Sequence, residues 1–326
     1  MGTVTLPNTH AFAHYPGGFK CSPLLQEKLV YIGQLNTFQK ASEIAAEIGG
    51  LKSSDSTIHR LCQSYGQAVE EELYAEQAPQ AATTAEQEVL YAQLDGGMVF
   101  TDEKWKEVKL GRVYRQELDG ASVQVSTYAA HLGAHPAFCD KFTTVIEGAR
   151  RGGERPVFLS DGARWIGQWI ARKYPGALHI LDFYHAAEHL NGFAKQALAP
   201  AAAGAWYAQR RVELRQADGV HKVMRAIRAL EELAPGGQAA RLKLLTYLTN
   251  NESRMDYFAY RQAGYIIGSG AIESAHRTVV QARLKLSGQR WSMAGAQQML
   301  NLRVAYMSGR KNIVTHAIQR AAVKIV

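Results

Sequence analysis

Hydrophobic positions recur with a helical period over much of the first 75 residues. Residues 1–35 are irregular around a Pro-Gly-Gly turn and end in a short amphipathic stretch, LLQEKLVYIG. The segment TFQKASEIAAEIGG predicts a helix that Thr37 caps and that Gly49-Gly50 ends. In the following helix, apolar residues lie at helical spacing, namely Ile58, Leu61, Cys62, Tyr65 and Val69. Two helices with a short turn are compatible with a helix-turn-helix DNA reader, and also with a plain packing unit.

From residue 89 the period changes. The stretch EQAPQAATTAEQE (76–88) has the composition of a linker. Three strand candidates then follow, EVLYAQLDGGMVF, KEVKLGRVYRQ and SVQVSTYAAHLG. A helix is predicted at about 136–150, a strand at 155–162, a helix at about 163–173, a strand at 177–183 and a helix from about Tyr184. The order β-β-β-α-β-α-β-α predicts an α/β fold, a mixed sheet with helices on its faces.

After residue 200 every pattern is helical, including AWYAQRRVELRQ, GVHKVMRAIRALEELA and QAARLKLLTYLTNN. A final helix-rich section begins near Gly268-Ser269-Gly270. These patterns predict two blocks of helices after the sheet.

Charge is distributed unevenly between the two parts of the chain. The 326 residues are 47% hydrophobic and carry a formal net charge of +8. From residue 201 onward there are 19 Lys and Arg against 7 Asp and Glu, a net charge of +12, so the first 200 residues carry −4. A basic C-terminal part indicates either a polyanionic partner, nucleic acid first, or a solvated set of basic helices.

Composition also excludes several classes of protein. No run approaches 18 apolar residues, which excludes a membrane-spanning helix. The N-terminus lacks the basic-then-apolar pattern of a secretory signal. Cys21, Cys62 and Cys139 are too few and too scattered for a disulfide framework or a Cys-rich zinc site. A reduced cytoplasm is the expected location.

Three acidic residues follow patterns that would bring them together. Asp95 ends the apolar run LYAQLD, and Asp161 ends VFLSD; glycine follows each of them. If the first and fourth strands are parallel neighbours, both side chains emerge at one edge of the sheet, where open mixed sheets hold ligands. Glu273 falls in the first turns of the helix that begins at Gly268-Ser269-Gly270.

Acids at buried strand ends are costly unless something compensates their charge. Two hard divalent cations, Mg²⁺ or Mn²⁺, would do so and would catalyse phosphoryl transfer. The glycines beside Asp95 and Asp161 would let a nucleic-acid backbone approach without a Cβ in the way. Each acid alone is also typical of a helix cap or a turn.

A further motif is His185-Ala-Ala-Glu188-His189, the H-x-x-E-H spacing of inverted zinc peptidases. On a helix both histidines share one face and would grip one ion, with Glu188 as a base. The motif supplies no third ligand.

Five segments occur in one order along the chain. They are YAQLDGGMVF with WKEVKLGRVY, then SDGARWI, LDFYHAAEHL, YIIGSGAIESAHRTVVQARLKLSGQRWS and QMLNLRVAY. This arrangement, over about residues 89–307, resembles the RNase H-like DDE transposases of bacterial insertion sequences, particularly the Kra-type subgroup. The resemblance implies that Asp95, Asp161 and Glu273 bind two Mg²⁺ or Mn²⁺ ions.

The resemblance also implies a division of the chain. An N-terminal helical region at 1–75 and the linker 76–88 would precede an RNase H-like catalytic domain. The first part of that domain would span 89–200, an all-helical insertion 201–262, and the C-terminal helices that carry Glu273 would span 263–326.

Further residues acquire roles from the resemblance. Asp182 and His185 match an Asp-x-x-His element of several transposase groups, as supporting or phosphate-contacting residues, which competes with the zinc-peptidase interpretation. Trp291 would stack on an unpaired base, or pack in the core. The basic side chains that would hold DNA phosphates are Arg277, Arg283, Lys285 and Arg290 after the glutamate, and Arg210, Arg211 and Arg215 in the insertion.

The activity that the resemblance implies is nicking at transposon ends, which frees 3′-hydroxyls that then attack target DNA. The partners would be double-stranded DNA and further copies of the chain, as a homodimer or larger assembly, in a bacterial cytoplasm and on its nucleoid. Two alternatives remain open: a non-catalytic DNA-binding protein derived from a transposase, and an RNase H-like nuclease without strand transfer.

Overall fold

The computed structural model describes residues 19, 21–76, 88–117 and 126–323. The fold is mixed α/β. Within the described residues there is a five-stranded mixed sheet of order β3-β2-β1-β4-β5. The strands β1 and β2 pair antiparallel, as do β2 and β3, while β4 and β5 continue the sheet parallel to β1. The predicted order of strands and helices is confirmed, with the bounds β1 Glu88–Thr101, β2 Lys104–Glu117, β3 Thr127–Leu132, β4 Val157–Ser160 and β5 His179–Leu181.

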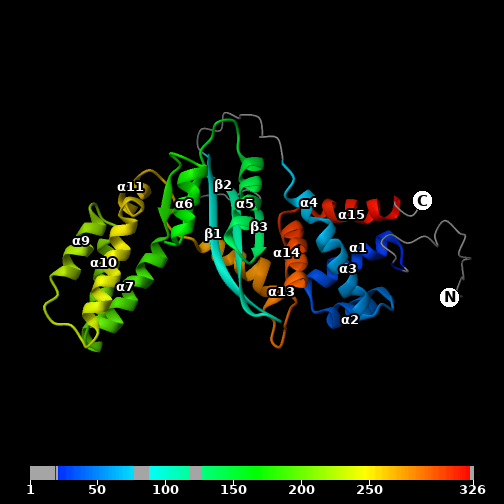
Figure 1. Cartoon of the computed structure of the whole chain (residues 1–326), viewed down its shortest axis with the longest axis horizontal. Helices are drawn as coiled ribbons and strands as arrows, with labels where there is room; N and C mark the ends of the chain where they lie inside the picture. Colours follow the sequence, from blue (N-terminus) through cyan, green and yellow to red (C-terminus); the bar gives the residue numbers. More distant parts are fainter. Residues whose placement is uncertain (1–18, 20, 77–87, 118–125, 324–326) are drawn as a thin grey trace, which may run out of the picture.

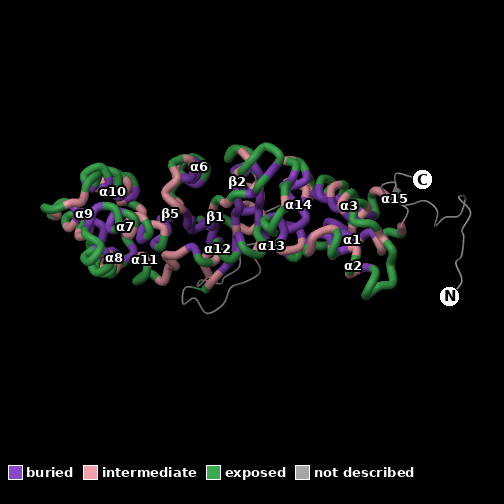
Figure 2. Tube along the Cα trace, turned by 90° about the horizontal axis from the view of Figure 1, so that it is seen from below, coloured by how far each residue is buried: buried purple, intermediate pink, exposed green. Residues whose placement is uncertain are grey.

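One face of the sheet is covered by α5 (His135–Ala149) and α6 (Arg164–Lys173). Because side chains alternate along a strand, every second residue of β1 points to this face. Leu90, Ala92 and Leu94 accordingly share a core with aromatic residues of the two helices. Figure 2 shows α6 and α12 on opposite sides of β1.

The other face of the sheet packs against a block of helices. Tyr91 of β1 and Leu159 of β4 share a buried cluster with α7 (Phe183–Ala197) and with the helices after residue 200. Figure 1 shows this block at one end of the elongated molecule. Its helices are α8 Pro200–Glu213, α9 Gly219–Arg228, α10 Gly237–Asn251 and α11 Tyr257–Gln262, with a 3₁₀ turn at Glu252–Arg254. The all-helical pattern predicted there is confirmed.

At the opposite end of the molecule, the N-terminal helices pack against the C-terminal segment. The N-terminal helices are α1 Pro23–Leu35, α2 Phe38–Gly49, α3 Asp55–Ala68 and α4 Glu70–Leu73. The C-terminal segment comprises α12 Gly270–Ala275, a π-helix at His276–Gln281, α13 Ala282–Leu284, α14 Met293–Met307 and α15 Lys311–Val323. Both sets contribute to one hydrophobic core, and they lie side by side in Figure 1.

The predicted N-terminal helices are confirmed in detail. The Thr37 side chain accepts a hydrogen bond from the Lys40 backbone and begins α2, and Gly50 ends it with a left-handed φ of 60°. The apolar residues predicted to share a face of α3 are all buried. Residues 1–35 were expected to be irregular before a short amphipathic stretch. This is wrong for Pro23–Leu35, because Ser22 caps a helix that Pro23 begins.

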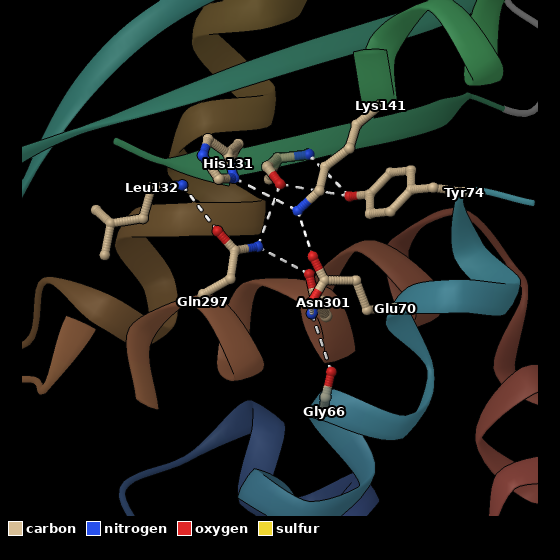
Figure 3. Close-up of polar contacts among 9 residues, drawn as sticks. Gly66, Glu70, Tyr74, His131, Leu132, Lys141, Gln297 and Asn301 are labelled. Carbon is tan, nitrogen blue, oxygen red and sulfur yellow. Dashed lines mark hydrogen bonds and ion pairs between the residues drawn. The ribbon is translucent and has the colours of Figure 1, made fainter. Parts of the chain in front are cut away.

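Side chains from the helices cover the edge strand β3 (Figure 3). The Leu132 N–H donates to Gln297 Oε1 at 2.8 Å, and the Ala130 N–H donates to the Tyr74 hydroxyl at 3.2 Å. The Tyr128 N–H donates to Ser308 Oγ at 3.0 Å. These bonds satisfy an edge that would otherwise offer its backbone to another chain. They also fasten α4 and α14 to the sheet.

Some expectations lie outside the described residues. The predicted linker 76–88 falls almost wholly on 77–87, and the third strand candidate begins within 118–125. Of the helices that the structure describes, none combines the length and the apolar character needed to cross a membrane.

Candidate active site

The register of the sheet brings Asp95 and Asp161 together. The parallel pairing of β1 and β4 ends where Leu94 lies beside Ser160. Asp95 is the next residue of β1, and Asp161 directly follows the end of β4. Asp95 has the same strand parity as Tyr91, which packs in the core beneath α7, so its side chain points to that face. The expected neighbourhood of the two aspartates is therefore found.

The sequence context predicted that Asp95 ends its strand, and this prediction is wrong. The strand β1 continues through Gly96 and Gly97 to Thr101, and Asp95 pairs with Leu110 of β2. The long β1–β2 hairpin projects beyond the end of β4, which has only four residues. Asp95 therefore stands where β1 loses its β4 neighbour, and this opening gives its side chain access to solvent.

Glu273 approaches from the C-terminal segment. It lies in the first turn of α12 and is exposed. Two contacts hold the start of this helix: the Arg112 guanidinium of β2 donates to the Ala271 carbonyl at 2.8 Å, and the Ser269 hydroxyl donates to the Asp182 carboxylate. The helix that carries Glu273 is thus tied to β2 and to the end of β5.

One cavity of about 230 Å³ unites these groups. It opens between the middle of β1, the ends of β4 and β5, the start of α7 and the start of α12. Asp95, Asp161 and Glu273 all contribute to its wall, although 112 residues separate the last two in the sequence. The lining residues are Leu94, Asp95, Asp161, Asp182, Tyr184, His185, Glu188, Ser269, Ile272 and Glu273.

Asp95 is held by neighbours that oppose one another electrostatically. Its Oδ1 accepts from the Gly96 N–H at 2.8 Å, and its Oδ2 lies 3.8 Å from Nε2 of the buried His276. Burial raises the pKa of the Asp95 carboxyl; His276 lowers it, and the nearby charge of Asp161 raises it again. The net shift is upward with burial as its largest cause, so a cation in this cavity would stabilise a carboxylate that is partly removed from water.

Asp182 supports the site from behind. Its side chain is 4% exposed, caps α7 by accepting from the Tyr184 N–H at 2.7 Å, and also accepts from Ser269. Burial raises its pKa to about 6, against the hydrogen bonds that it accepts from the backbone. This placement favours the supporting role over phosphate contact. His185, one turn further along α7, faces the cavity and is half-exposed.

The predicted use of the glycines is wrong for two of them. A Cβ at Gly97 would lie 2.9 Å from the His276 ring, and a Cβ at Gly162 would lie 2.9 Å from Tyr247. The space beside both backbones is therefore filled by protein side chains rather than left for a nucleic-acid backbone. Gly162 admits α10 close to the end of β4, and Gly97 admits the π-helix close to β1.

The donor set fits a hard divalent cation. The wall of the cavity is rich in carboxylate oxygens, which Mg²⁺ and Mn²⁺ prefer. Within the described ranges, no three His, Cys, Asp or Glu side chains converge closely enough to hold an ion alone. Mg²⁺ usually keeps several waters and binds one or two carboxylates together with substrate phosphates, so an open carboxylate set suits it.

The zinc-peptidase interpretation gains no support from the geometry. His185 and His189 share one face of α7 with ring centroids 5.0 Å apart, but the His189 ring stacks on Tyr247 at 3.9 Å. Both line a second cavity of about 360 Å³, between α7 and α10, that adjoins the carboxylates through His185 and Glu188. The described part of the chain offers the pair no third ligand.

Three of the residues predicted to contact DNA are buried, so those predictions are wrong. Arg283 is 1% exposed, donates to the Gly33 carbonyl at 3.0 Å and lies over the Phe38 ring. Trp291 is 7% exposed and packs on Arg283, which confirms the core-packing alternative. Arg210 is 8% exposed and pairs with Glu213, three residues on, at 2.6 Å.

The other basic residues predicted to contact DNA are exposed or partly exposed to solvent. Arg277, Lys285 and Arg290 are exposed on the C-terminal segment. Arg211 and Arg215 of the α8 region are partly exposed, and their guanidinium groups lie 6.0 and 5.3 Å from the Phe183 ring, next to Asp182. Both arginines therefore border the side of the site where α7 begins. Their contact with DNA stays a prediction.

Sequence reasoning missed the residues that position the aspartates. His276 belongs to a π-helix, a rare geometry that is frequent at functional sites, and no local pattern marks it. Behind Asp161, the Ser160 hydroxyl lies 2.9 Å from Nε2 of His179, whose Nδ1 lies 3.3 Å from Arg254. Burial and Arg254 lower the pKa of His179 to about 3, so this ring is neutral. The only signal in the sequence is that short apolar strands end or begin with a polar residue, as β4 does with Ser160 and β5 with His179.

The comparisons with known proteins place the chain in a family. No curated protein matches the sequence. The family model described as Uncharacterised protein family (UPF0236) matches residues 19–316, which include the sheet, every residue of the cavity and the helices up to the first part of α15. Because this match covers most of its length, the chain belongs to the UPF0236 family.

Proposed function

We propose that the chain is a DDE-type transposase, a divalent-metal-dependent enzyme that cuts DNA at transposon ends and joins the freed ends to target DNA. One observation carries the proposal. Asp95 and Asp161 follow the last register pair of two parallel neighbouring strands, and Glu273 reaches the same cavity from a helix more than a hundred residues later.

The topology supports an RNase H-like identity for the sheet. Three antiparallel strands precede two strands parallel to the first, and helices alternate with the later strands. In this interpretation the helices α8–α11, between Asp161 and Glu273, form the insertion domain. The region Phe38–Ala68, whose two helices share a short turn, would be a DNA-reading unit.

Some residues of the site would bind cations, and others, in or beside the cavity, position the residues that bind. Asp95, Asp161 and Glu273 would bind two Mg²⁺ or Mn²⁺ ions, which supply activation of water or a 3′-hydroxyl and stabilisation of the leaving oxygen. The His276 ring positions Asp95, with Nε2 3.8 Å from Oδ2, and Asp182 positions the start of the Glu273 helix by accepting a hydrogen bond from Ser269. Such positioning matters because phosphoryl transfer depends mainly on alignment and electrostatics.

Charge supports DNA as the substrate. The part of the chain after residue 200 carries a net charge of +12, and it includes the exposed Arg277, Lys285 and Arg290 on the segment that follows Glu273. Phosphate contacts by such side chains position a duplex without reading its sequence. Joining requires two DNA ends, so we expect two or more copies of the chain to act together.

A plasmid assay tests the proposed function. The full-length chain is incubated with a supercoiled plasmid that carries its gene and flanking DNA, with Mg²⁺ or with EDTA. We expect Mg²⁺-dependent nicks at fixed positions that leave 3′-hydroxyls, and joining of a supplied pre-cut end to a second plasmid. Cutting without joining would indicate a nuclease, and binding without cutting would indicate a non-catalytic DNA-binding protein; either result contradicts the proposal.

A further inference from the structure

The tip of the β1–β2 hairpin and the segment after α13 enclose a hollow that the proposed chemistry does not use. Its volume is about 470 Å³. The hairpin tip and α13 lie away from α9, α10 and α11 (Figure 1). The lining residues of the hollow are Phe100, Trp105, Leu284, Lys285, Leu286, Ser287, Gly288, Gln289 and Arg290.

Large apolar side chains are left open to solvent around this hollow. Trp105 is 57% exposed, Phe100 38% and Leu286 37%. The rings of Phe100 and Trp105 lie 5.3 Å apart and tilt 56° from one another. Scattered single apolar residues need no explanation, but a cluster that includes a mostly exposed tryptophan is typical of a binding surface.

The hollow is rigid because backbone bonds join its two walls. The Asp102 N–H donates to the Trp291 carbonyl at 2.8 Å, and the Trp291 N–H donates to the Phe100 carbonyl at 3.2 Å. The Trp291 side chain is buried in the core and anchors the second wall. A preformed surface of this kind loses little conformational entropy when it binds a ligand.

The charges on the rim favour an anion. Lys285 and Arg290 are exposed, and none of the described residues that line the hollow is acidic. The Arg290 guanidinium also donates to the Asp102 carbonyl at 3.3 Å. On the hairpin turn, the Glu103 carboxylate is engaged by Lys106 at 2.9 Å. A ligand that suits aromatic rings flanked by exposed cations combines a flat ring with a negative charge, as a nucleotide does.

We propose that this hollow binds single-stranded DNA, with a base stacked on Trp105 and Phe100 and the adjoining phosphates on Lys285 and Arg290. The inference rests on the proposed function, because it makes the strand a flank of the DNA that the carboxylates cut. Phe100 follows Asp95 by five residues on β1, roughly 17 Å.

Binding is tested with the full-length chain and a fluorescein-labelled oligothymidylate about 12 nucleotides long. Fluorescence anisotropy is measured in EDTA, so that no cutting occurs. We expect Trp105→Ala to raise the Kd about 5- to 150-fold, because stacking on one aromatic ring accounts for such a factor. Trp105→Phe should retain most of the affinity. Phe258→Ala, which removes an aromatic ring 41% exposed on α11, is the matched control and should leave Kd unchanged.

The cations are tested by the salt dependence of the same binding. The double variant Lys285→Ala, Arg290→Ala should reduce the slope of log K against log salt by about 0.7 for each lost phosphate contact. The inference is overturned if the unaltered chain does not bind the oligonucleotide, or if Trp105→Ala binds as the unaltered chain does. Loss of self-association in Trp105→Ala, with DNA binding intact, would instead make the hollow a contact between copies of the chain and would overturn the inference as well.

The plasmid assay separates this inference from the proposed function. If the unaltered chain cuts DNA and Trp105→Ala binds the oligonucleotide normally, the inference alone fails. If the unaltered chain binds through Trp105 but never cuts with any divalent cation, the proposed function alone fails. Trp105 is exposed, so its replacement should not affect folding, and a thermal melt of both variants checks this.

Discussion

Asp161→Asn should lower the rate of Mg²⁺-dependent DNA nicking by about 10³-fold or more, which corresponds to about 4 kcal/mol in the activation barrier. The change keeps the shape of the side chain and its acceptor for the Ala163 N–H, at 3.0 Å from Oδ1, while it removes the charge that would bind a cation. The protein should therefore remain folded and should still bind DNA. Initial nicking rates and anisotropy with duplex DNA measure the two properties separately.

Asp140→Asn is the matched control, because Asp140 is exposed on α5, on the face of the sheet away from the cavity. We expect it to cut DNA at the unaltered rate. If Asp161→Asn also retains full activity, Asp161 does not bind a catalytic cation. If it loses DNA binding together with cutting, its effect is structural and does not bear on the chemistry.

Arg283→Ala should reduce the free energy of unfolding by about 3–5 kcal/mol. The side chain is 1% exposed, its guanidinium lies 4.6 Å from the Phe38 centroid and 5.0 Å from that of Trp291, and it donates to the Gly33 carbonyl. Alanine would leave a cavity between α13 and the N-terminal helices, and the Gly33 carbonyl would lose its partner. Denaturant unfolding, with the slope held in common, measures the change.

Two further variants separate charge from volume at this position. Arg283→Met fills the space without the buried charge, so we expect a smaller loss of about 1–2 kcal/mol. Arg277→Ala, an exposed arginine six residues earlier, should change stability by no more than about 0.5 kcal/mol. Weaker DNA binding by Arg283→Ala with unchanged stability would show that the side chain faces DNA, contrary to its burial.

Sequence patterns predicted the sheet and the approach of its two aspartates because both depend on short-range regularities. The apolar runs before Asp95 and Asp161 predict two strands, and parallel pairing of these strands places both acids at one edge of the sheet. The length of β1 could not be read in this way. Glycines at 96 and 97 resemble a turn, yet β2 pairs with them throughout.

For the basic residues, charge alone led to wrong predictions of DNA contact, whereas helical spacing would have predicted burial or ion pairing. Arg283 follows Val279 by four residues, so the two share a helix face, and Val279 is buried. That spacing indicated burial, whereas the prediction followed the charge alone. Arg210 and Glu213 likewise stand at i and i+3, a spacing that favours an ion pair on one helix. The N-terminal helix carried a similar signal in Ser22-Pro23.

Other features of the site depend on contacts between distant segments, which one sequence does not reveal. The ring of His276 fills the space beside Gly97, 179 residues away, and a π-helix rather than a regular helical turn brings it there. The Ser269 hydroxyl meets Asp182 across 87 residues. The exposure of Trp105 and the burial of Trp291 follow from how the hairpin tip packs on the segment after α13.

The proposed function requires that the side chains of Asp95, Asp161 and Glu273 together bind a hard cation. Crystals of the full-length chain soaked in Mn²⁺, with DNA bound, allow its position to be read directly from anomalous scattering. We expect Mn²⁺ peaks between the carboxylates of Asp95 and Asp161 and beside Glu273. Mn²⁺ absent from this cavity, or bound only at His185 and His189, would contradict the account.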